Sequence, residues 1–355
     1  MEILKFKPLE FSKERLNIKD LNIRTGKEWR YASSGKAALY HCLKSLGVEG
    51  VVLIPAYVCK SILKPIEQLN LKCIYYDVNS NNLNVSIDDL EYKLNNNKVD
   101  CVIIASMYGN PADMVKAELL CKEHNILLVD DAAQSFEAKI NDRYIGTFGD
   151  AGFFSLSPGK ATSGHLGAFF WTSNKEYTIK RTNHFFIHFV IYLDFLFNRY
   201  HIYRFKKIKI FVLLTYFKIL LLKMFDLNND KINFFEKNII GGILKANKDQ
   251  TFRKRLLKKL DRDLKVKDSI VLITSGNKGA NNHKIVIVCN SQSLSMELML
   301  IFNQEGVYAT NGYELLNNGK ACPNAKNLVS RIIEIPLEDS VEKLLYIKKI
   351  LIKNT

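Results

Sequence analysis

Lys160 stands in a run of small residues between two strongly apolar stretches, within the sequence GFFSLSPGKATSGHLGAFFW. A lysine between apolar strands is unusual, because a buried ammonium group needs a partner or must give up its proton. Partial burial and a neighbouring cation both lower the pKa of an amine, and an unprotonated amine can attack an aldehyde. Lys160 is therefore a candidate for covalent catalysis, with Ser155 and Ser157 beside it. An ordinary surface lysine is the alternative.

Two carboxylates, Asp130 and Asp131, end the apolar run ILLVDD, and Gln134 follows them. A carboxylate at the end of a strand can cap a helix, bind a metal ion or pair with a buried cation. A protonated pyridine ring is one such cation, and its charge allows the ring to withdraw electrons from a carbanion. The residues alone leave these alternatives open.

A Ser-Gly turn in SSGKAAL, residues 33–39, precedes a predicted helix. The free backbone N–H groups at a helix N-terminus, together with the helix dipole, favour a bound phosphate. Gly35 and Lys36 would lie at this end of the helix. The same turn also fits a simple helix cap.

The elements that must position these residues alternate between short apolar runs and helical stretches. Predicted strands cover residues 51–56, 71–78, 100–106, 126–131, 150–157 and 167–173. Continuous apolar strands separated by helices predict an α/β fold, with a mostly parallel sheet covered on both faces. Active sites in such sheets lie at the carboxyl ends of the strands.

A smaller α/β unit is predicted after the basic helix FRKRLLKKLDRDL. It contains the strand KIVIVCN, the helix SMELMLIFNQEG, the segment RIIEIPL and a final helix. We place the boundary near Asn247, which divides the chain into a large domain, residues 1–247, and a small C-terminal domain, residues 248–355.

An apolar, aromatic and basic insert interrupts the alternation at about residues 184–230, with the segments FFIHFVIYLDFLF and IKIFVLLTYFKILLLKMF. Each segment is too short and too charged for a confident bilayer span of about 20 residues. A buried helical hairpin or dimer contact is one interpretation. An interfacial helix pair on an acidic membrane, through residues 184–225, is another, and insertion into the bilayer is the third.

Composition narrows the class of protein. The 355 residues are 47% hydrophobic and 25% charged, which is typical of a soluble globular protein. Seven cysteines without regular spacing indicate free thiols in a reducing cytoplasm, and the charged N-terminal sequence does not indicate export. The net charge of +15 suits an anionic partner. Nucleic acid is disfavoured, because the aromatic residues of the basic stretch alternate with Leu and Ile as in a core or interface.

Several motifs occur in a characteristic order: SGKAAL, IPAYVC, YGNPADM, LLVDDAAQSF, IGTFGDAGFFSLSPGK and ACPNAKNLVSRIIEIPL. Their order and spacing resemble the DegT/DnrJ-type nucleotide-sugar aminotransferases, which are pyridoxal-phosphate (PLP) enzymes of fold type I. The resemblance is close over about residues 30–173 and weaker over about 231–350. It implies a large, mostly parallel, seven-stranded sheet domain, a smaller C-terminal α/β domain, and a homodimer.

Carried over by position, the resemblance implies that Lys160 binds PLP covalently and that Asp131 pairs with the ring nitrogen, with Asp130 behind it. Gln134 would approach the ring hydroxyl. The phosphate would be held by Gly35, Lys36 and Ser155.

Two further cofactor contacts are implied. Tyr57 is the nearest aromatic candidate for stacking on the ring, although strict register places Cys59 there. Asn233, in KINFFEKNIIGGIL, would reach the phosphate of the partner subunit, but Phe235 stands where an Arg is usual.

The chain also departs from the family pattern after the lysine. Ala161 replaces the usual Asn, and Leu166 stands where a Glu is expected to position the substrate or donor; His165 could take over a polar role. The resemblance implies an aminotransferase that moves an amino group from glutamate to a keto-sugar nucleotide for surface polysaccharide synthesis. The cysteines and the insert predict a place in the cytoplasm or at the inner face of the membrane. One rival is another PLP-dependent step on a sugar. A second is a non-catalytic binding or membrane-associated subunit of glycan assembly.

Overall fold

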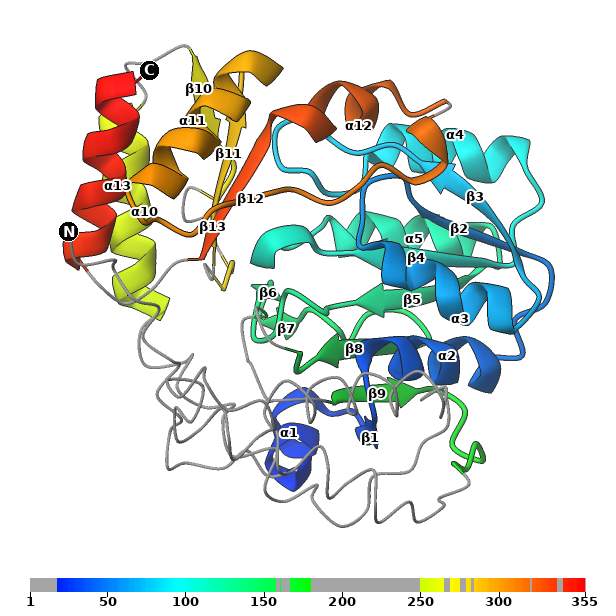
Figure 1. Ribbon diagram of the computed structural model, residues 1–355. Coiled ribbons are helices and arrows are strands. Elements are labelled where there is room, and N and C mark those ends of the chain that lie inside the picture. Colours follow the sequence, from blue (N-terminus) through cyan, green and yellow to red (C-terminus); the bar gives the residue numbers. More distant parts are fainter. Residues whose placement is uncertain are drawn as a thin grey trace, which may run out of the picture.

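Two sheets, each with its own helices, form the described part of the protein (Figure 1). The structure is a computed structural model, and it describes residues 18–157, 160, 167–179, 250–264, 269–274, 279–281, 284–319, 321–336 and 341–354. The insert at 184–230 and the boundary near Asn247 lie outside these residues. The division into domains 1–247 and 248–355 therefore stays a prediction.

The large sheet has seven strands in the order β1-β9-β8-β5-β4-β2-β3. Their bounds are β1 Arg30–Ala32, β2 Val51–Pro55, β3 Lys72–Tyr76, β4 Cys101–Ala105, β5 Leu127–Asp131, β8 Ala151–Ser155 and β9 Ala168–Thr172. The central strands pair in parallel, while β9 runs antiparallel to both β8 and β1. This confirms the predicted α/β fold with a mostly parallel seven-stranded sheet.

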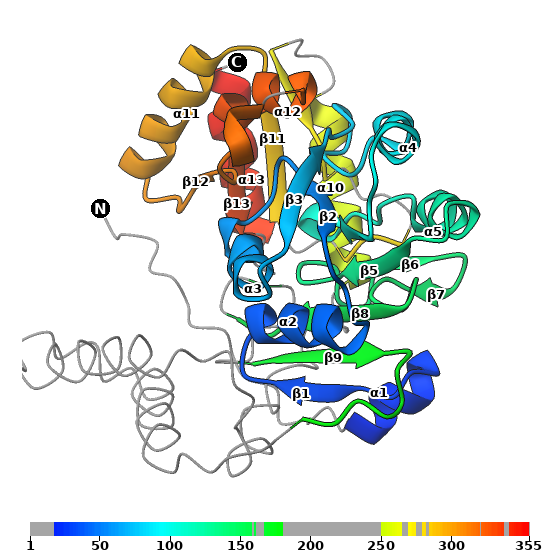
Figure 2. The same ribbon diagram turned by 90° about the vertical axis from the view of Figure 1, so that its right-hand side faces the viewer.

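Helices cover both faces of the large sheet (Figures 1 and 2). One face packs against α2, Gly35–Ser45, and α3, Leu63–Gln68, which follows a 3₁₀ helix at Lys60–Ile62. The opposite face packs against α1, Ile18–Thr25, α4, Ile87–Asn96, and α5, Met114–Glu123. Alternate side chains of the strands enter the two cores, which explains why the strands read as continuous apolar runs. A short hairpin, β6 Lys139–Ile140 and β7 Arg143–Tyr144, follows β5.

The small sheet has four antiparallel strands in the order β10-β11-β13-β12. Their bounds are β10 Ile270–Leu272, β11 Lys284–Cys289, β12 Thr310–Asn311 and β13 Ile332–Pro336. A core of its own joins this sheet to α10, Gln250–Leu264, α11, Gln292–Gln304, and α13, Val341–Asn354. The other face of the sheet, including Val286, Val288 and Ile332, belongs to a core shared with the large sheet.

A connecting segment leaves the small sheet after β12, lies over the large sheet and returns as β13 (Figure 1). It contains a 3₁₀ helix at Leu316–Gly319, α12 at Pro323–Leu328 and a second 3₁₀ helix at Val329–Arg331. Leu316 N donates to the Ala56 carbonyl at 2.8 Å, and the Asp77 carboxylate accepts from Asn324 N at 2.9 Å and Ala325 N at 2.8 Å. Asp77 is buried and ties the start of α12 to the end of β3.

No helix in the described ranges combines the length and the apolar character that a bilayer crossing requires. The segments proposed for membrane contact, residues 184–225, lie outside those ranges.

Candidate active site

A cavity of about 270 Å³ opens at the carboxyl ends of β4 and β5. It is lined by Ser34, Gly35, Lys36, Leu39, Val58, Cys59, Ser61, Ile62, Ala105, Ser106, Asp131, Ala133, Gln134, Phe153, Ser155, Ser157 and Lys160. The structure therefore brings together eight of the residues singled out in the sequence, although they come from segments more than 100 residues apart. This is the place where ligands bind in open α/β sheets.

One end of the cavity is formed by the start of α2. Ser34 caps the helix, and its Oγ accepts a hydrogen bond from Ala37 N at 3.2 Å. An ideal Cβ on Gly35 would lie only 3.2 Å from Ser155 Cβ and 3.3 Å from Ser155 Oγ. Glycine therefore allows the helix to approach β8 closely, so that backbone N–H groups, Lys36 and the Ser155 hydroxyl meet at one end of the cavity.

The loop that carries Lys160 is shaped by local hydrogen bonds. Ser155 Oγ donates to Ser157 Oγ at 3.0 Å, and Ser157 N donates to Ser155 Oγ at 3.3 Å. Lys160 N donates to the Ser157 carbonyl at 3.2 Å. These bonds turn the chain beyond β8 so that Lys160 lines the same cavity as Asp131.

The Lys160 amine and the Asp131 carboxylate affect each other electrostatically. Burial lowers the pKa of Lys160, while the negative charge of Asp131 raises it, and the net shift is downward. Burial raises the pKa of Asp131 to about 6, although a hydrogen bond from Ala133 N at 2.9 Å and the charge of Lys160 oppose the rise. The pair thus supplies an amine that is easier to deprotonate and a buried acid that can face a cation.

The orientation of the Gln134 amide follows from its contacts. Tyr108 N donates to Gln134 Oε1 at 3.3 Å, and a backbone N–H can only donate, so this oxygen is the acceptor. Gln134 Nε2 lies 3.7 Å from Met107 Sδ, a weak acceptor. Gln134 is buried, yet it lines the cavity, so its NH₂ group suits a ligand oxygen there.

The Asp130 side chain projects from the face of the large sheet opposite to Asp131 and makes its hydrogen bonds there. Its Oδ2 accepts hydrogen bonds from Gly146 N at 2.6 Å and Phe148 N at 3.1 Å, and Asp130 is fully buried. Burial raises its pKa to about 7, although these two bonds lower it. Asp130 is not among the cavity-lining residues, and its contacts stabilise the turn before β8.

The structure places Cys59, and not Tyr57, at the cavity. Tyr57 is fully buried, and its hydroxyl lies 2.5 Å from Tyr108 Oη and accepts from Tyr313 N at 3.0 Å. Cys59 lines the cavity, with its Sγ 3.1 Å from Ser61 Oγ. The structure therefore does not bring Tyr57 to the cavity, and strict register identifies the residue that faces it.

Other cavity residues were not singled out in the sequence. Ser34, Ser61, Ser106 and Phe153 line the cavity, and only their places in or beside SGKAAL, IPAYVC, YGNPADM and IGTFGDAGFFSLSPGK could have indicated them. Asn233, Ala161, His165 and Leu166 lie outside the described residues.

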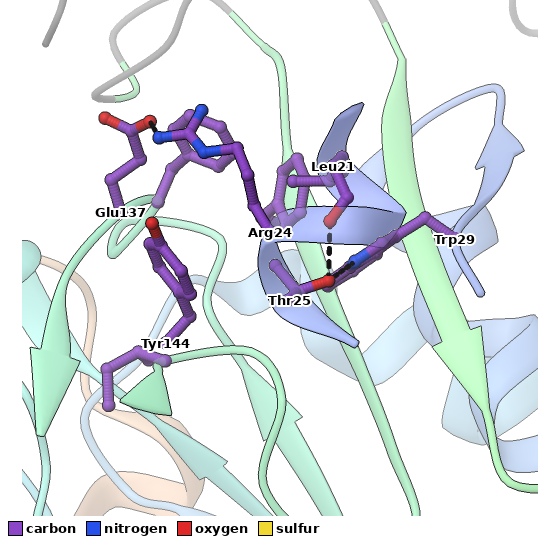
Figure 3. Close-up of a pocket in the computed structure, with 9 residues that line it drawn as sticks. Leu21, Arg24, Thr25, Trp29, Glu137 and Tyr144 are labelled. Carbon is purple, nitrogen blue, oxygen red and sulfur yellow. Dashed lines mark hydrogen bonds and ion pairs between the residues drawn. The ribbon is translucent and has the colours of Figure 1, made fainter. Parts of the chain in front are cut away.

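A second pocket lies between α1 and the β6–β7 hairpin, lined by Leu21, Arg24, Trp29, Glu137 and Tyr144 among others (Figure 3). Arg24 and Glu137 pair across it at 3.0 Å. Its volume of about 10 Å³ holds about one water molecule, so it is not a ligand site. In the part of the chain that the structure describes, no three His, Cys, Asp or Glu side chains group as a metal site requires.

Comparisons with known proteins agree with this fold. Residues 31–186 match the DegT/DnrJ/EryC1/StrS aminotransferase family. GDP-perosamine synthase of Escherichia coli O157:H7 is 30% identical over 145 residues, which are 40% of this chain and 40% of that protein. The match thus spans less than half the length of this relative.

Solved structures match over almost the whole chain. A DegT DnrJ EryC1 StrS aminotransferase from Brucella abortus superposes with a TM-score of 0.70 at 16% identity, covering 95% of this chain and 88% of that one. The E. coli GDP-4-keto-6-deoxy-D-mannose-3-dehydratase with bound hydrated PLP gives a TM-score of 0.66 at 16% identity, covering 94% and 90%. At such identities the likeness shows the fold. Residues 31–186 therefore match this aminotransferase family in sequence, and the chain shares the fold of a solved DegT DnrJ EryC1 StrS aminotransferase.

Proposed function

We propose that this protein is a PLP-dependent aminotransferase that transfers an amino group from glutamate to a keto-sugar nucleotide for surface polysaccharide synthesis. The observation that carries the proposal is the cavity in which Lys160 and Asp131 meet at the carboxyl ends of the central strands. An amine with a lowered pKa and a buried carboxylate are the two groups that this chemistry needs in one place.

The cavity residues fit PLP in character. A helix N-terminus, the Lys36 ammonium group and the Ser155 hydroxyl would hold the phosphate at one end. Asp131 would pair with a protonated ring nitrogen, and the Gln134 amide, whose oxygen accepts from Tyr108 N, would donate to the ring oxygen. The structure of the E. coli GDP-4-keto-6-deoxy-D-mannose-3-dehydratase, which has the same fold and contains hydrated PLP, supports this assignment.

Each residue then has a separate task. PLP supplies an electron sink that stabilises a carbanion next to its reactive carbon. Asp131 would keep the ring nitrogen protonated, and its burial would strengthen that interaction. Lys160 would hold the cofactor covalently, and its amine would move a proton as general base and acid. Ser155 and the start of α2 hold the phosphate and so fix the ring relative to Lys160.

The substrates are proposed from the relatives and the charge. GDP-perosamine synthase is named for a nucleotide sugar, and the net charge of +15 favours an anionic diphosphate. Glutamate as donor and Asn233 as a contact of a homodimer remain predictions. Residence in the cytoplasm and contact of residues 184–225 with the inner face of the membrane are further predictions. Flotation with anionic liposomes tests the last one, and recovery in the soluble fraction at low and high salt would refute it.

One experiment tests the central proposal. Protein purified with PLP should show a visible absorption band, and Lys160→Ala should lack it, whereas Lys116→Ala on the exposed surface of α5 should keep it. Glutamate should remove the band, because the cofactor takes up its amino group. Absence of the band from the wild-type protein at saturating PLP would refute the enzyme and favour a non-catalytic binding subunit. A band that glutamate leaves unchanged would refute glutamate as donor.

A further inference from the structure

Glu334 is a buried carboxylate in the middle of the apolar strand β13, Ile-Ile-Glu-Ile-Pro, and only 5% of its surface is exposed. Its neighbours Ile333 and Ile335 enter the core of the small domain. Because side chains alternate along a strand, the Glu334 side chain projects from the opposite face of the small sheet, the face that packs against the large sheet. A buried charge is costly unless it is paired, so its partners decide why it is there.

Both oxygens of Glu334 are occupied. Lys284 Nζ on the neighbouring strand β11 donates to Glu334 Oε2 at 2.5 Å. In the antiparallel register Glu334 lies opposite Val286, so Lys284 is its diagonal neighbour on the same face. The other oxygen, Oε1, accepts a hydrogen bond from the Tyr108 hydroxyl at 2.6 Å. Lys284 thus balances the charge, while Tyr108 carries the contact across to the large domain.

Tyr108 is held at both of its ends. Its backbone, in the 3₁₀ helix Met107–Gly109 after β4, has a φ of 56°, which is unfavourable for a bulky residue and persists only when neighbours fix it. Its N–H donates to Gln134 Oε1 in the cavity wall, and its phenol reaches Glu334 and lies 2.5 Å from Tyr57 Oη. One residue therefore connects the small sheet to the side chain that faces the ligand.

We propose that Tyr108 and Glu334 are positioning residues, through which the small sheet fixes the donor group of Gln134 toward the cofactor. The proposal rests on the proposed function, because PLP is the ligand that Gln134 would contact. Without the Glu334 contact the strained turn at Tyr108 can relax, and the N–H that orients the Gln134 amide moves with it. The small sheet then influences cofactor affinity without a residue of its own beside the ring.

A double-mutant cycle on PLP affinity tests this coupling. Dissociation constants are measured by fluorescence titration for the wild type, Tyr108→Phe, Gln134→Ala and the double variant. Loss of one hydrogen bond is worth about 1 kcal/mol, so Tyr108→Phe should weaken binding roughly fivefold to tenfold. If Tyr108 acts through Gln134, it should weaken binding little further when Gln134 is already Ala. Additive effects, or an unchanged affinity of Tyr108→Phe, would overturn the proposal.

The matched control is Tyr76→Phe. Tyr76 is also fully buried and donates one hydrogen bond, to the Ile103 carbonyl at 3.1 Å, but it lies in the other core of the large sheet. It should lower the unfolding temperature without changing PLP affinity. An equal loss of affinity in this control would show a general effect of destabilisation and overturn the proposal.

The contact between Tyr108 and Glu334 can also be removed by changing residues of the small sheet. Lys284→Met with Glu334→Leu deletes both charges together, so that no unpaired charge stays buried. This variant should weaken PLP binding as Tyr108→Phe does, and unchanged binding would contradict the proposal, even if Tyr108→Phe fails to fold. If the wild type itself does not bind PLP, the proposed function and this inference both fail. If it binds and the cycle is additive, only the inference fails.

Discussion

Asp131 raises the pKa of Lys160 while burial lowers it, so the charge of one cavity residue sets the reactivity of the other. Neutralising the acid in Asp131→Asn should therefore lower the pKa of Lys160 further. In the absence of PLP, reductive methylation of Lys160 should then begin at a lower pH than in the wild type. Peptide mass spectrometry measures the labelled fraction, with exposed Lys116 as an internal control. A labelling profile that moves to higher pH would contradict the pairing.

Cys59 offers a chemical probe of the cavity. Cys59 and Cys73 are partly exposed, whereas the other five cysteines are buried. Cys59 lines the cavity, and Cys73 lies outside it on β3, with its Sγ 3.2 Å from Tyr75 Oη. We expect PLP to slow alkylation of Cys59 by iodoacetamide at least about tenfold, which corresponds to about 1.4 kcal/mol of protection, and to leave Cys73 unchanged. Equal protection of both thiols would place the cofactor elsewhere.

Substitution of Gly35 tests whether the start of α2 and Ser155 bind the phosphate of PLP. A methyl group at this position would press on the Ser155 side chain at 3.2 Å, so Gly35→Ala should displace the hydroxyl. We expect PLP affinity to fall about tenfold, or about 1.4 kcal/mol. Adding Ser155→Gly removes the obstacle and should not weaken binding further, which titration can show. Unchanged affinity in Gly35→Ala would mean that the phosphate is held by other groups.

The raised pKa of Asp130 leads us to expect that the stability of the protein depends on pH. Its pKa is raised from 3.8 to about 7, mainly by burial, so the folded protein binds a proton that the unfolded chain has released. The resulting stabilisation is complete below about pH 4 and is lost as the pH rises through 7. Relative to the wild type, Asp130→Asn should therefore gain stability between pH 4.5 and 7.5, by roughly 1 to 4 kcal/mol. Urea unfolding at both pH values measures this, with Asp113→Asn at the exposed N-cap of α5 as the charge control, because Asn also caps helices.

The lowered pKa of Glu118 leads us to expect the opposite dependence of stability on pH. Burial raises its pKa, but two hydrogen bonds from Arg143, each 3.0 Å, and one from Gly149 N at 2.9 Å outweigh that effect and lower the pKa to about 2. The stabilisation is therefore present above pH 4.5 and is lost as the pH falls toward 2. Glu118→Gln should cost about 1.5 to 3 kcal/mol at pH 7, measured by urea unfolding, and less at pH 3. A cost that does not change with pH would refute the ionic contribution.

Six of the seven strands of the large sheet could be predicted almost residue by residue. Apolar runs such as 51–56 and 126–131 match β2 and β5 because both faces of the sheet are buried. The sequence did not reveal β1, β10 and β12, of two or three residues each, because so short a run has no measurable periodicity. Their pairing depends on strands far away in the chain.

The site was predictable where a motif sets it locally. Lys160, Asp131, Gln134, Gly35 and Ser155 all reach the cavity. Strict register already indicated Cys59 at the cavity, but the reason for the burial of Tyr57 was hidden, because Leu315 and Tyr313, which contact Tyr57, lie far away in the chain. The contact between Tyr108 and Glu334 was equally hidden, since 226 residues separate them.

The chain passes from the small sheet to the large sheet and back again between β12 and β13. A cut between β9 and β10 would keep the strands of each sheet together, but it would separate the large sheet from the segment between β12 and β13 that packs on it. A fragment that stops after β9 would lack Leu316, Cys322 and Ala325, which complete one of its cores. We expect both sheets to melt together in one calorimetric transition, and attempts to express the large sheet alone to yield aggregates.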